Sequence, residues 1–174
     1  VVEPDVEKVG RVHDRLRAMG ITHLLTIGGD DTALSARFIA DRSRGGIRVV
    51  HVPKTIDNDI CGTDYSFGFD TAINTVVDAI DRVRTTTESH KRVMVVEVMG
   101  RHCGEIALIS GIGGGADAVM IPEVKTDIDE LIHDINEGNK HGKKTNLIVV
   151  AEGDEFGGAY KVSEALQKRA GIKS

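Results

Sequence analysis

Apolar and polar positions alternate along the chain in blocks that predict helices and strands in turn. Apolar residues at helical spacing predict helices over residues 4–19, 31–43, 69–88, 104–112, 128–140 and 160–170. Short apolar runs predict strands over residues 22–27, 47–52, 92–98, 116–121 and 145–152. Strands and helices in strict alternation predict an α/β fold with parallel, Rossmann-like sheets that helices cover on both faces.

The segments that follow the predicted strands form what we call the rim. In open α/β sheets, ligands bind beyond the carboxyl ends of the strands, so the rim is where a site is expected. These segments are unusually rich in acids and glycines: GGDDT (28–32), PKTIDND (53–59), MGRHCG (99–104), PEVKTD (122–127) and EGDEFGG (152–158).

Composition and charge exclude several classes of protein. The chain has 22 basic and 27 acidic residues, and this net charge of −5 argues against a nucleic-acid partner. It contains no apolar run long enough to span a bilayer and no signal-peptide pattern, so we expect no membrane partner. Cys61 and Cys103 form no CxxC pair, which favours a reducing, cytoplasmic setting. P-loop, GxGxxG and GxSxG motifs are absent.

The GGDDT segment lies between a predicted strand and a predicted helix. Gly28 and Gly29 would let the backbone approach a phosphorylated donor closely. Asp31 or Thr32 would cap the helix, and Asp30 would help to hold a Mg²⁺ ion that a phosphate brings. The alternative is a glycine turn with a helix cap and no ligand.

The PKTIDND segment concentrates charge directly after a strand. Asp57 and Asp59 are two residues apart and would point the same way in an extended segment, with Asn58 fixing its neighbours through amide hydrogen bonds. One carboxylate would accept a proton from an alcohol while the other orients the alcohol or a metal. Lys54 would offset the charge of a phosphate. The alternative is a solvated turn held by Asx hydrogen bonds.

Three further charged residues lie at or near strand ends. Arg101 would grip a phosphate or a sugar oxygen, or would simply be a surface arginine after a strand. Arg92 lies between a helix end and a strand, where compensation of the helix dipole explains it as well as a ligand does. Glu152 is a lone acid on the rim.

Taken in order, GGDDT, PKTIDND, MGR and the PE after the 116–121 strand resemble the 6-phosphofructokinase family. The resemblance covers about residues 20–152. It implies transfer of a phosphoryl group to the 1-hydroxyl of fructose 6-phosphate. It also implies that Asp57 is the general base, that Asp59 and Thr55 orient sugar and phosphoryl group, and that Asp30 is the acid associated with Mg²⁺.

The same resemblance implies contacts with the sugar phosphate by Met99, Gly100, Arg101 and Glu152. Arg92 would reach the sugar phosphate across a subunit boundary, which implies a homodimer or homotetramer. The resemblance further implies two lobes, a phosphoryl-donor lobe over residues 1–68 and a fructose 6-phosphate lobe over residues 69–174. Both lobes are expected to be incomplete, because the family's donor loop would precede residue 1 and a sugar-phosphate segment would follow residue 174.

Two residues lead to an expectation about the phosphoryl donor. ATP-using members of the family normally have glycine at the positions of Asp31 and Lys54, whereas pyrophosphate-dependent members have the residues found here. Asp31 would repel the α-phosphate of ATP, and Lys54 would hold a short donor. The resemblance therefore implies a pyrophosphate-dependent 6-phosphofructokinase of glycolysis.

Three alternatives remain open at this point. The first is an ATP-dependent 6-phosphofructokinase, and the second is a non-catalytic regulatory domain that binds a sugar phosphate. The third is an enzyme like diacylglycerol kinase or NAD kinase, against which PKTIDND and MGR argue.

Overall fold

The computed structural model describes residues 5–90 and 92–174, and the chain divides into two compact units. One unit contains the residues up to Thr55 together with Asp59–Gly68, and the other contains Ile56–Asn58 together with Phe69–Ser174. Every helix among the described residues is too short or too polar to cross a membrane. The assignment of a donor role and a sugar role to two lobes stays a prediction.

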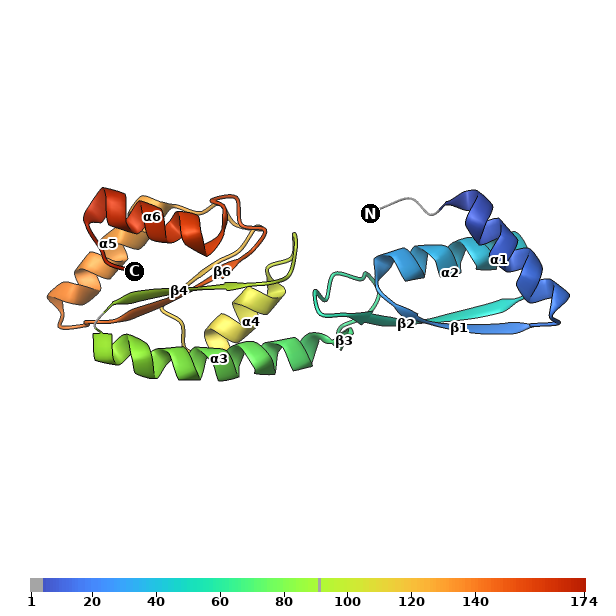
Figure 1. Ribbon diagram of the computed structural model, residues 1–174, viewed down its shortest axis with the longest axis horizontal. Coiled ribbons are helices and arrows are strands. Elements are labelled where there is room, and N and C mark those ends of the chain that lie inside the picture. Colours follow the sequence, from blue (N-terminus) through green and yellow to red (C-terminus); the bar gives the residue numbers. More distant parts are fainter. Residues whose placement is uncertain (1–4, 91) are drawn as a thin grey trace. The chain divides into compact units, whose positions relative to one another are not determined.

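The first unit is a parallel sheet with two helices on one face. Its strands are β1 (His23–Gly28), β2 (Arg48–Thr55) and β3 (Phe67–Gly68), in the order β1-β2-β3. Helices α1 (Val6–Ala18) and α2 (Asp30–Ser43) lie on the same side of this sheet (Figure 1). Leu25, Ile27 and Val50 are 61, 61 and 62% exposed, so among the described residues no element covers the other face.

Local chemistry explains where these elements begin and end. Asp5 is the N-cap of α1 and accepts a hydrogen bond from the backbone N–H of Lys8 at 3.1 Å. The predicted helix start at residue 4 lies outside the described residues. The predicted end of the second strand at residue 52 is wrong, because β2 continues through Pro53 to Thr55. Pro53 has no backbone N–H to donate. It lies opposite Gly28, the last residue of β1, so the ladder between β1 and β2 ends at this pair and the missing donor costs little.

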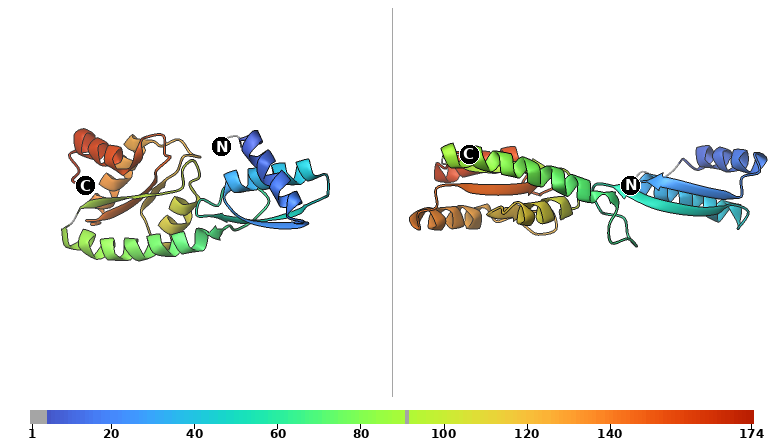
Figure 2. Two further views of the ribbon diagram at one scale, coloured as in Figure 1. Left: turned by 45° about the vertical axis from the view of Figure 1, so that its right-hand side comes forward. Right: turned by 90° about the horizontal axis from the view of Figure 1, so that it is seen from below.

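The second unit is a parallel sheet covered on both faces. Its strands are β4 (Val93–Val98), β5 (Ala118–Met120) and β6 (Asn146–Ala151), in the order β4-β6-β5. Helices α3 (Phe69–His90) and α4 (Glu105–Gly113) lie on one face, and α5 (Ile128–Lys140) and α6 (Gly158–Ala170) lie on the other (Figures 1 and 2). The expectation of an α/β fold built from parallel sheets is confirmed.

The central strand of this sheet is β6, not β4. The apolar run of residues 92–98 is also typical of a central strand, but of these strands only β6 is buried along its whole length. Leu147, Val149 and Ala151 pack into one core cluster with α3 and α4, while Ile148 and Val150 pack into a second cluster with α5 and α6. Because β4, β6 and β5 are parallel neighbours, the rim segments that follow them lie side by side at one edge of the sheet.

Candidate functional site

The glycine segment of the first unit is tightly packed. A side chain at Gly28 would overlap Thr32 Oγ1, so only glycine fits between the end of β1 and the first turn of α2. Gly29 precedes α2 as its N-cap, and the described residues provide no side-chain hydrogen bond to that cap. The structure therefore brings the predicted donor residues Gly28, Gly29, Asp31 and Thr32 together at one helix N-terminus, where backbone N–H groups favour an anion.

The prediction that Asp31 or Thr32 caps the helix is wrong. Helix α2 begins at Asp30, so both residues lie inside its first turn. Asp30 and Asp31 are the acidic residues of that turn, and a negative charge there is stabilised by the helix dipole. This stabilisation explains Asp31 without reference to any donor.

Asp30 is suited to a magnesium ion that arrives with a phosphate. Within residues 5–90 and 92–174 there is no group of three or more histidine, cysteine or acidic side chains that could hold a metal on its own. Protein Mg²⁺ sites commonly combine one or two carboxylates with substrate phosphates and water. The carboxylate of Asp30 fits that chemistry, and its metal role stays a prediction.

Lys54, Thr55 and Asp59 belong to the same unit as the glycine segment. The carbonyl oxygen of Lys54 would lie 3.8 Å from a Cβ atom at Gly29, so the backbone of Lys54 passes beside the glycine segment. Thr55 is the last residue of β2, and its carbonyl oxygen accepts a hydrogen bond from Ser66 Oγ at 2.8 Å. Asp59 is exposed.

Asp57 lies in the second unit, next to Asn58, which contacts the start of α4. Asp57 is only 8% exposed, and its Oδ2 atom lies 3.9 Å from Arg101 Nε. The next residue, Asn58, has a left-handed backbone with φ of 57°, which asparagine tolerates better than most residues. Its Nδ2 atom donates a hydrogen bond to Glu105 Oε2 at 2.7 Å. These contacts hold a buried carboxylate beside a guanidinium group.

The expectation that Asp57 and Asp59 share one side of an extended segment is wrong. Strand β2 ends at Thr55, and the left-handed backbone of Asn58 turns the chain between the two acids. Asp57 is buried and Asp59 is exposed, and the two residues belong to different units. The burial and the arginine contact of Asp57 make it the better candidate for a base.

The Met99–Gly104 turn carries the predicted sugar-phosphate contacts. Glu152 Oε1 accepts hydrogen bonds from the backbone N–H groups of Gly100 at 3.1 Å and Arg101 at 2.7 Å. Arg101 has a left-handed backbone with φ of 51°, and its side chain is 70% exposed. The structure therefore unites Met99, Gly100, Arg101 and Glu152 on the rim of the second unit. Arg92 is exposed just before β4, and its role across a subunit boundary is untested.

Sequence reasoning did not identify the contact between Asn58 and Glu105. It expected the Asn58 amide to bond its own neighbours, because the pattern of an Asx turn is local. One partner of this amide is 47 residues further along the chain, at the first residue of α4. The sequence did predict that both segments lie on the rim. That prediction brings the segments near each other but does not say which residue of one contacts which residue of the other.

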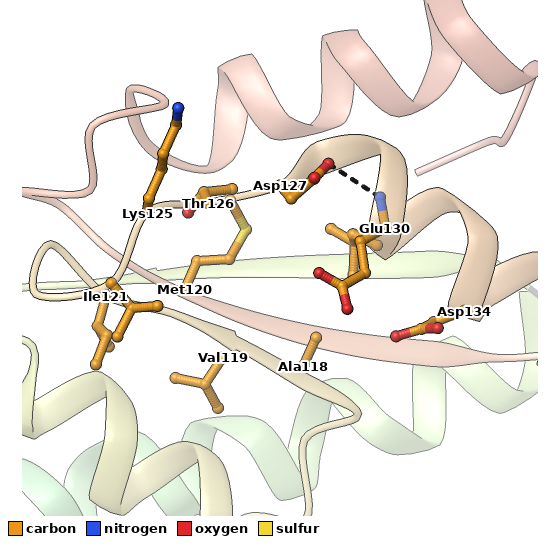
Figure 3. Close-up of a pocket in the computed structure, with 11 residues that line it drawn as sticks. Ala118, Val119, Met120, Ile121, Lys125, Thr126, Asp127, Glu130 and Asp134 are labelled. Carbon is orange, nitrogen blue, oxygen red and sulfur yellow. Dashed lines mark hydrogen bonds between the residues drawn. The ribbon is translucent and has the colours of Figure 1, made fainter.

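A shallow groove lies elsewhere on the second unit, between β5 and α5 (Figure 3). It has a volume of about 200 Å³, and Lys125, Glu130 and Asp134 are among the side chains that line it. Asp127 caps α5 there by accepting hydrogen bonds from the N–H groups of Asp129 and Glu130 at 2.9 and 3.1 Å. Its lining residues, all within the described part of the chain, include none of the predicted site residues.

Comparison with known proteins shows what the chain is similar to. The family profile named Phosphofructokinase matches residues 2–174. The chain is 48% identical over 159 residues to ATP-dependent 6-phosphofructokinase 1 of Clostridium perfringens, an alignment that covers 91% of the chain and 48% of that protein. It is 47% identical over 163 residues to ATP-dependent 6-phosphofructokinase of Bacillus pumilus, covering 91% and 50% of the two chains.

A solved structure agrees with the fold. The structure of a pyrophosphate-dependent phosphofructokinase from Nitrosospira multiformis matches with a TM-score of 0.85 and 26% identity, covering 97% of this chain and 47% of that one. The chain spans about half the length of the curated relatives it matches.

The predicted pyrophosphate donor is wrong. The curated relatives at 47 to 48% identity are named ATP-dependent, whereas the similar structure with a pyrophosphate-dependent title is only 26% identical. The prediction depended on Asp31 and Lys54 alone. Asp31 stabilises the first turn of α2, so its charge is not evidence for a particular donor.

Proposed function

The chain belongs to the phosphofructokinase family, and we propose that it is the catalytic part of an ATP-dependent 6-phosphofructokinase. The observation that carries this proposal is its 48% identity to a relative with that name. The geometry of the second unit supports it, because the buried Asp57 carboxylate lies beside Arg101 on the rim. The substrates would be ATP and fructose 6-phosphate, and the products ADP and fructose 1,6-bisphosphate.

The proposed chemistry is an in-line phosphoryl transfer. Asp57 accepts the proton of the sugar 1-hydroxyl as that oxygen forms a bond with the γ-phosphorus of ATP. The bond between the γ-phosphorus and the bridging oxygen breaks, and ADP leaves with the bonding electron pair. Arg101 offsets negative charge near the reacting groups, and Lys54 and the N–H groups at the start of α2 hold donor phosphates.

A bound Mg²⁺ ion would supply further positive charge for the donor phosphates, with Asp30 as the carboxylate that helps to hold it. We also propose that Asp59 and Thr55 orient the reacting groups and that Arg92 reaches the sugar phosphate of a neighbouring subunit in a homo-oligomer. A cytoplasmic setting follows from the proposed glycolytic role.

The test is a coupled assay of fructose 6-phosphate phosphorylation by the intact protein with ATP or with pyrophosphate. We expect turnover with ATP. Substituting Asp57→Asn removes the proton acceptor but preserves the shape of the side chain, so turnover should fall by roughly 10²- to 10⁴-fold. The Michaelis constant for fructose 6-phosphate should change little.

Asp78→Asn is the matched control, because Asp78 is an exposed acid in the middle of α3. It should retain the turnover of the unmodified protein. Binding of fructose 6-phosphate without any turnover would refute the proposal and support the non-catalytic regulatory alternative. Unchanged turnover in Asp57→Asn would show that another group is the base.

A further inference from the structure

Two carboxylates hold opposite ends of the Met99–Gly104 turn. Glu152, which follows β6, accepts the N–H groups of Gly100 and Arg101 at the front of the turn. Glu123, which follows β5 in the PE motif, accepts the N–H group of Gly104 at the back, with Oε1 2.7 Å from the nitrogen. The turn itself follows β4, so all three strand ends contribute to one local structure.

The back end of the turn is closely fitted to Glu123. A Cβ atom at Gly104 would lie 2.5 Å from Glu123 Oε2 and 2.5 Å from Ile121 Cβ, which is too close for any side chain. Gly104 is the N-cap of α4, and its carbonyl oxygen accepts a hydrogen bond from the N–H of Leu108 at 2.9 Å. The absence of a side chain at Gly104 therefore lets Glu123 join the end of β5 to the start of α4.

Two residues of this region, Arg101 and Glu105, contact the Asp57–Asn58 segment. Arg101 has a left-handed backbone, which is strained for a non-glycine residue and so needs support from its surroundings. Its Nε atom lies 3.9 Å from Asp57 Oδ2. Glu105, which directly follows Gly104, accepts the hydrogen bond from Asn58. A shift at Gly104 would therefore move both neighbours of the Asp57 segment.

We propose that Glu123 is a positioning residue for phosphoryl transfer, because its bond to Gly104 holds the turn that places Arg101 and Glu105 beside the Asp57 segment. The inference rests on the proposed function, since it assigns Glu123 a role through Asp57 and Arg101. It also gives a physical role to Glu123 of the PE motif, for which the sequence analysis predicted no function.

The experiment compares Glu123→Ala and Glu123→Gln in the intact protein by hydrogen exchange and by steady-state kinetics. Alanine removes the acceptor, so exchange of the Gly104 amide should accelerate by roughly 10- to 100-fold, the loss expected for a hydrogen bond to a charged acceptor. Turnover should fall by roughly 10-fold or more, because small displacements of catalytic groups have large kinetic effects. The Michaelis constant for fructose 6-phosphate should rise while that for ATP stays unchanged.

Glutamine provides the rescue, because its side-chain carbonyl oxygen can accept the same N–H group. Glu123→Gln should keep most of the exchange protection and most of the turnover. Asp134→Ala is the matched control, since Asp134 is an exposed acid on α5 away from the turn. It should match the unmodified protein in both measurements.

Three outcomes would overturn the inference. Unchanged Gly104 exchange in Glu123→Ala would show that the bond does not hold the turn. Faster exchange with unchanged kinetics would leave Glu123 a purely structural residue. A loss of turnover with both Michaelis constants unchanged would indicate a smaller folded fraction rather than a displaced turn. If the unmodified protein had no phosphofructokinase activity, the proposed function would fail, and hydrogen exchange would still decide whether Glu123 holds the turn.

Discussion

Close backbone contacts decide which residues the rim of the second unit can contain. Gly153 follows Glu152, and a Cβ atom at this position would overlap the carbonyl oxygen of Arg101. This oxygen belongs to the backbone and not to a flexible side chain, so it can move away only if the Met99–Gly104 turn moves with it. The hydrogen bonds from Gly100 and Arg101 to Glu152 depend on this close approach.

Gly153→Ala should therefore destabilise the protein by about 1–3 kcal/mol, the usual cost of inserting atoms into a well-packed region. The measurement is the free energy of unfolding from chemical denaturation. Gly113→Ala is the control, because a Cβ atom at Gly113 would make only an ordinary 3.7 Å contact with Val77 Cγ2. Equal stability of the two variants would contradict the close contact described for Gly153.

At the scale of elements, the sequence pattern predicted each helix that the structure describes and each described strand except the two-residue β3. Strand β6 could be predicted because its apolar run is continuous, as expected for a strand buried on both faces. Its central position could not be predicted, since β4 has a similar run and the order of strands depends on long-range pairing. Strand β3 has two residues, Phe67 and Gly68, and is too short for any periodic pattern.

The burial of β6 predicts a graded loss of stability at Ile148, which is 0% exposed and packs with α5 and α6. Ile148→Val should reduce the free energy of unfolding by about 0.5–1.5 kcal/mol, and Ile148→Ala by about 2–5 kcal/mol. Chemical denaturation of both variants is the measurement. A loss below 0.5 kcal/mol for Ile148→Ala would contradict the buried position of this strand.

A second element-scale prediction concerns the start of α5. Asp127 accepts two backbone N–H groups of the first turn, so Asp127→Ala should cost about 1 kcal/mol of stability. Asp127→Asn should lose little, because asparagine is an equally good N-cap. If the two variants were equally destabilised, the loss would come from the charge rather than from capping.

At the scale of the whole molecule, the alternation of strands and helices was enough to predict the parallel α/β class. It was also enough to place the candidate residues on the rim. The contacts of individual residues were less predictable, because the turn at Asn58 buries Asp57 while leaving Asp59 exposed. The choice of donor was wrong because it depended on Asp31 and Lys54 alone, whereas relatives at 47 to 48% identity are named ATP-dependent.

The prediction that turnover requires Mg²⁺ concerns the whole molecule, because the ion would contact both the protein and the phosphoryl donor. Chelation of Mg²⁺ should abolish turnover with ATP, and addition of Mg²⁺ should restore it. Asp30→Asn should raise the Mg²⁺ concentration needed for half-maximal turnover, since one ligand loses its charge. Full activity in the presence of excess chelator would contradict the role assigned to the metal.

The left-handed backbone of Arg101 has a consequence for protein engineering. Replacing this residue by leucine or valine would alter the local fold and remove a cation at once, so the resulting defect could not be attributed to either change. Glycine and asparagine adopt this conformation readily and lack the cation. A mutant library at position 101 that includes both would separate electrostatic effects from conformational ones.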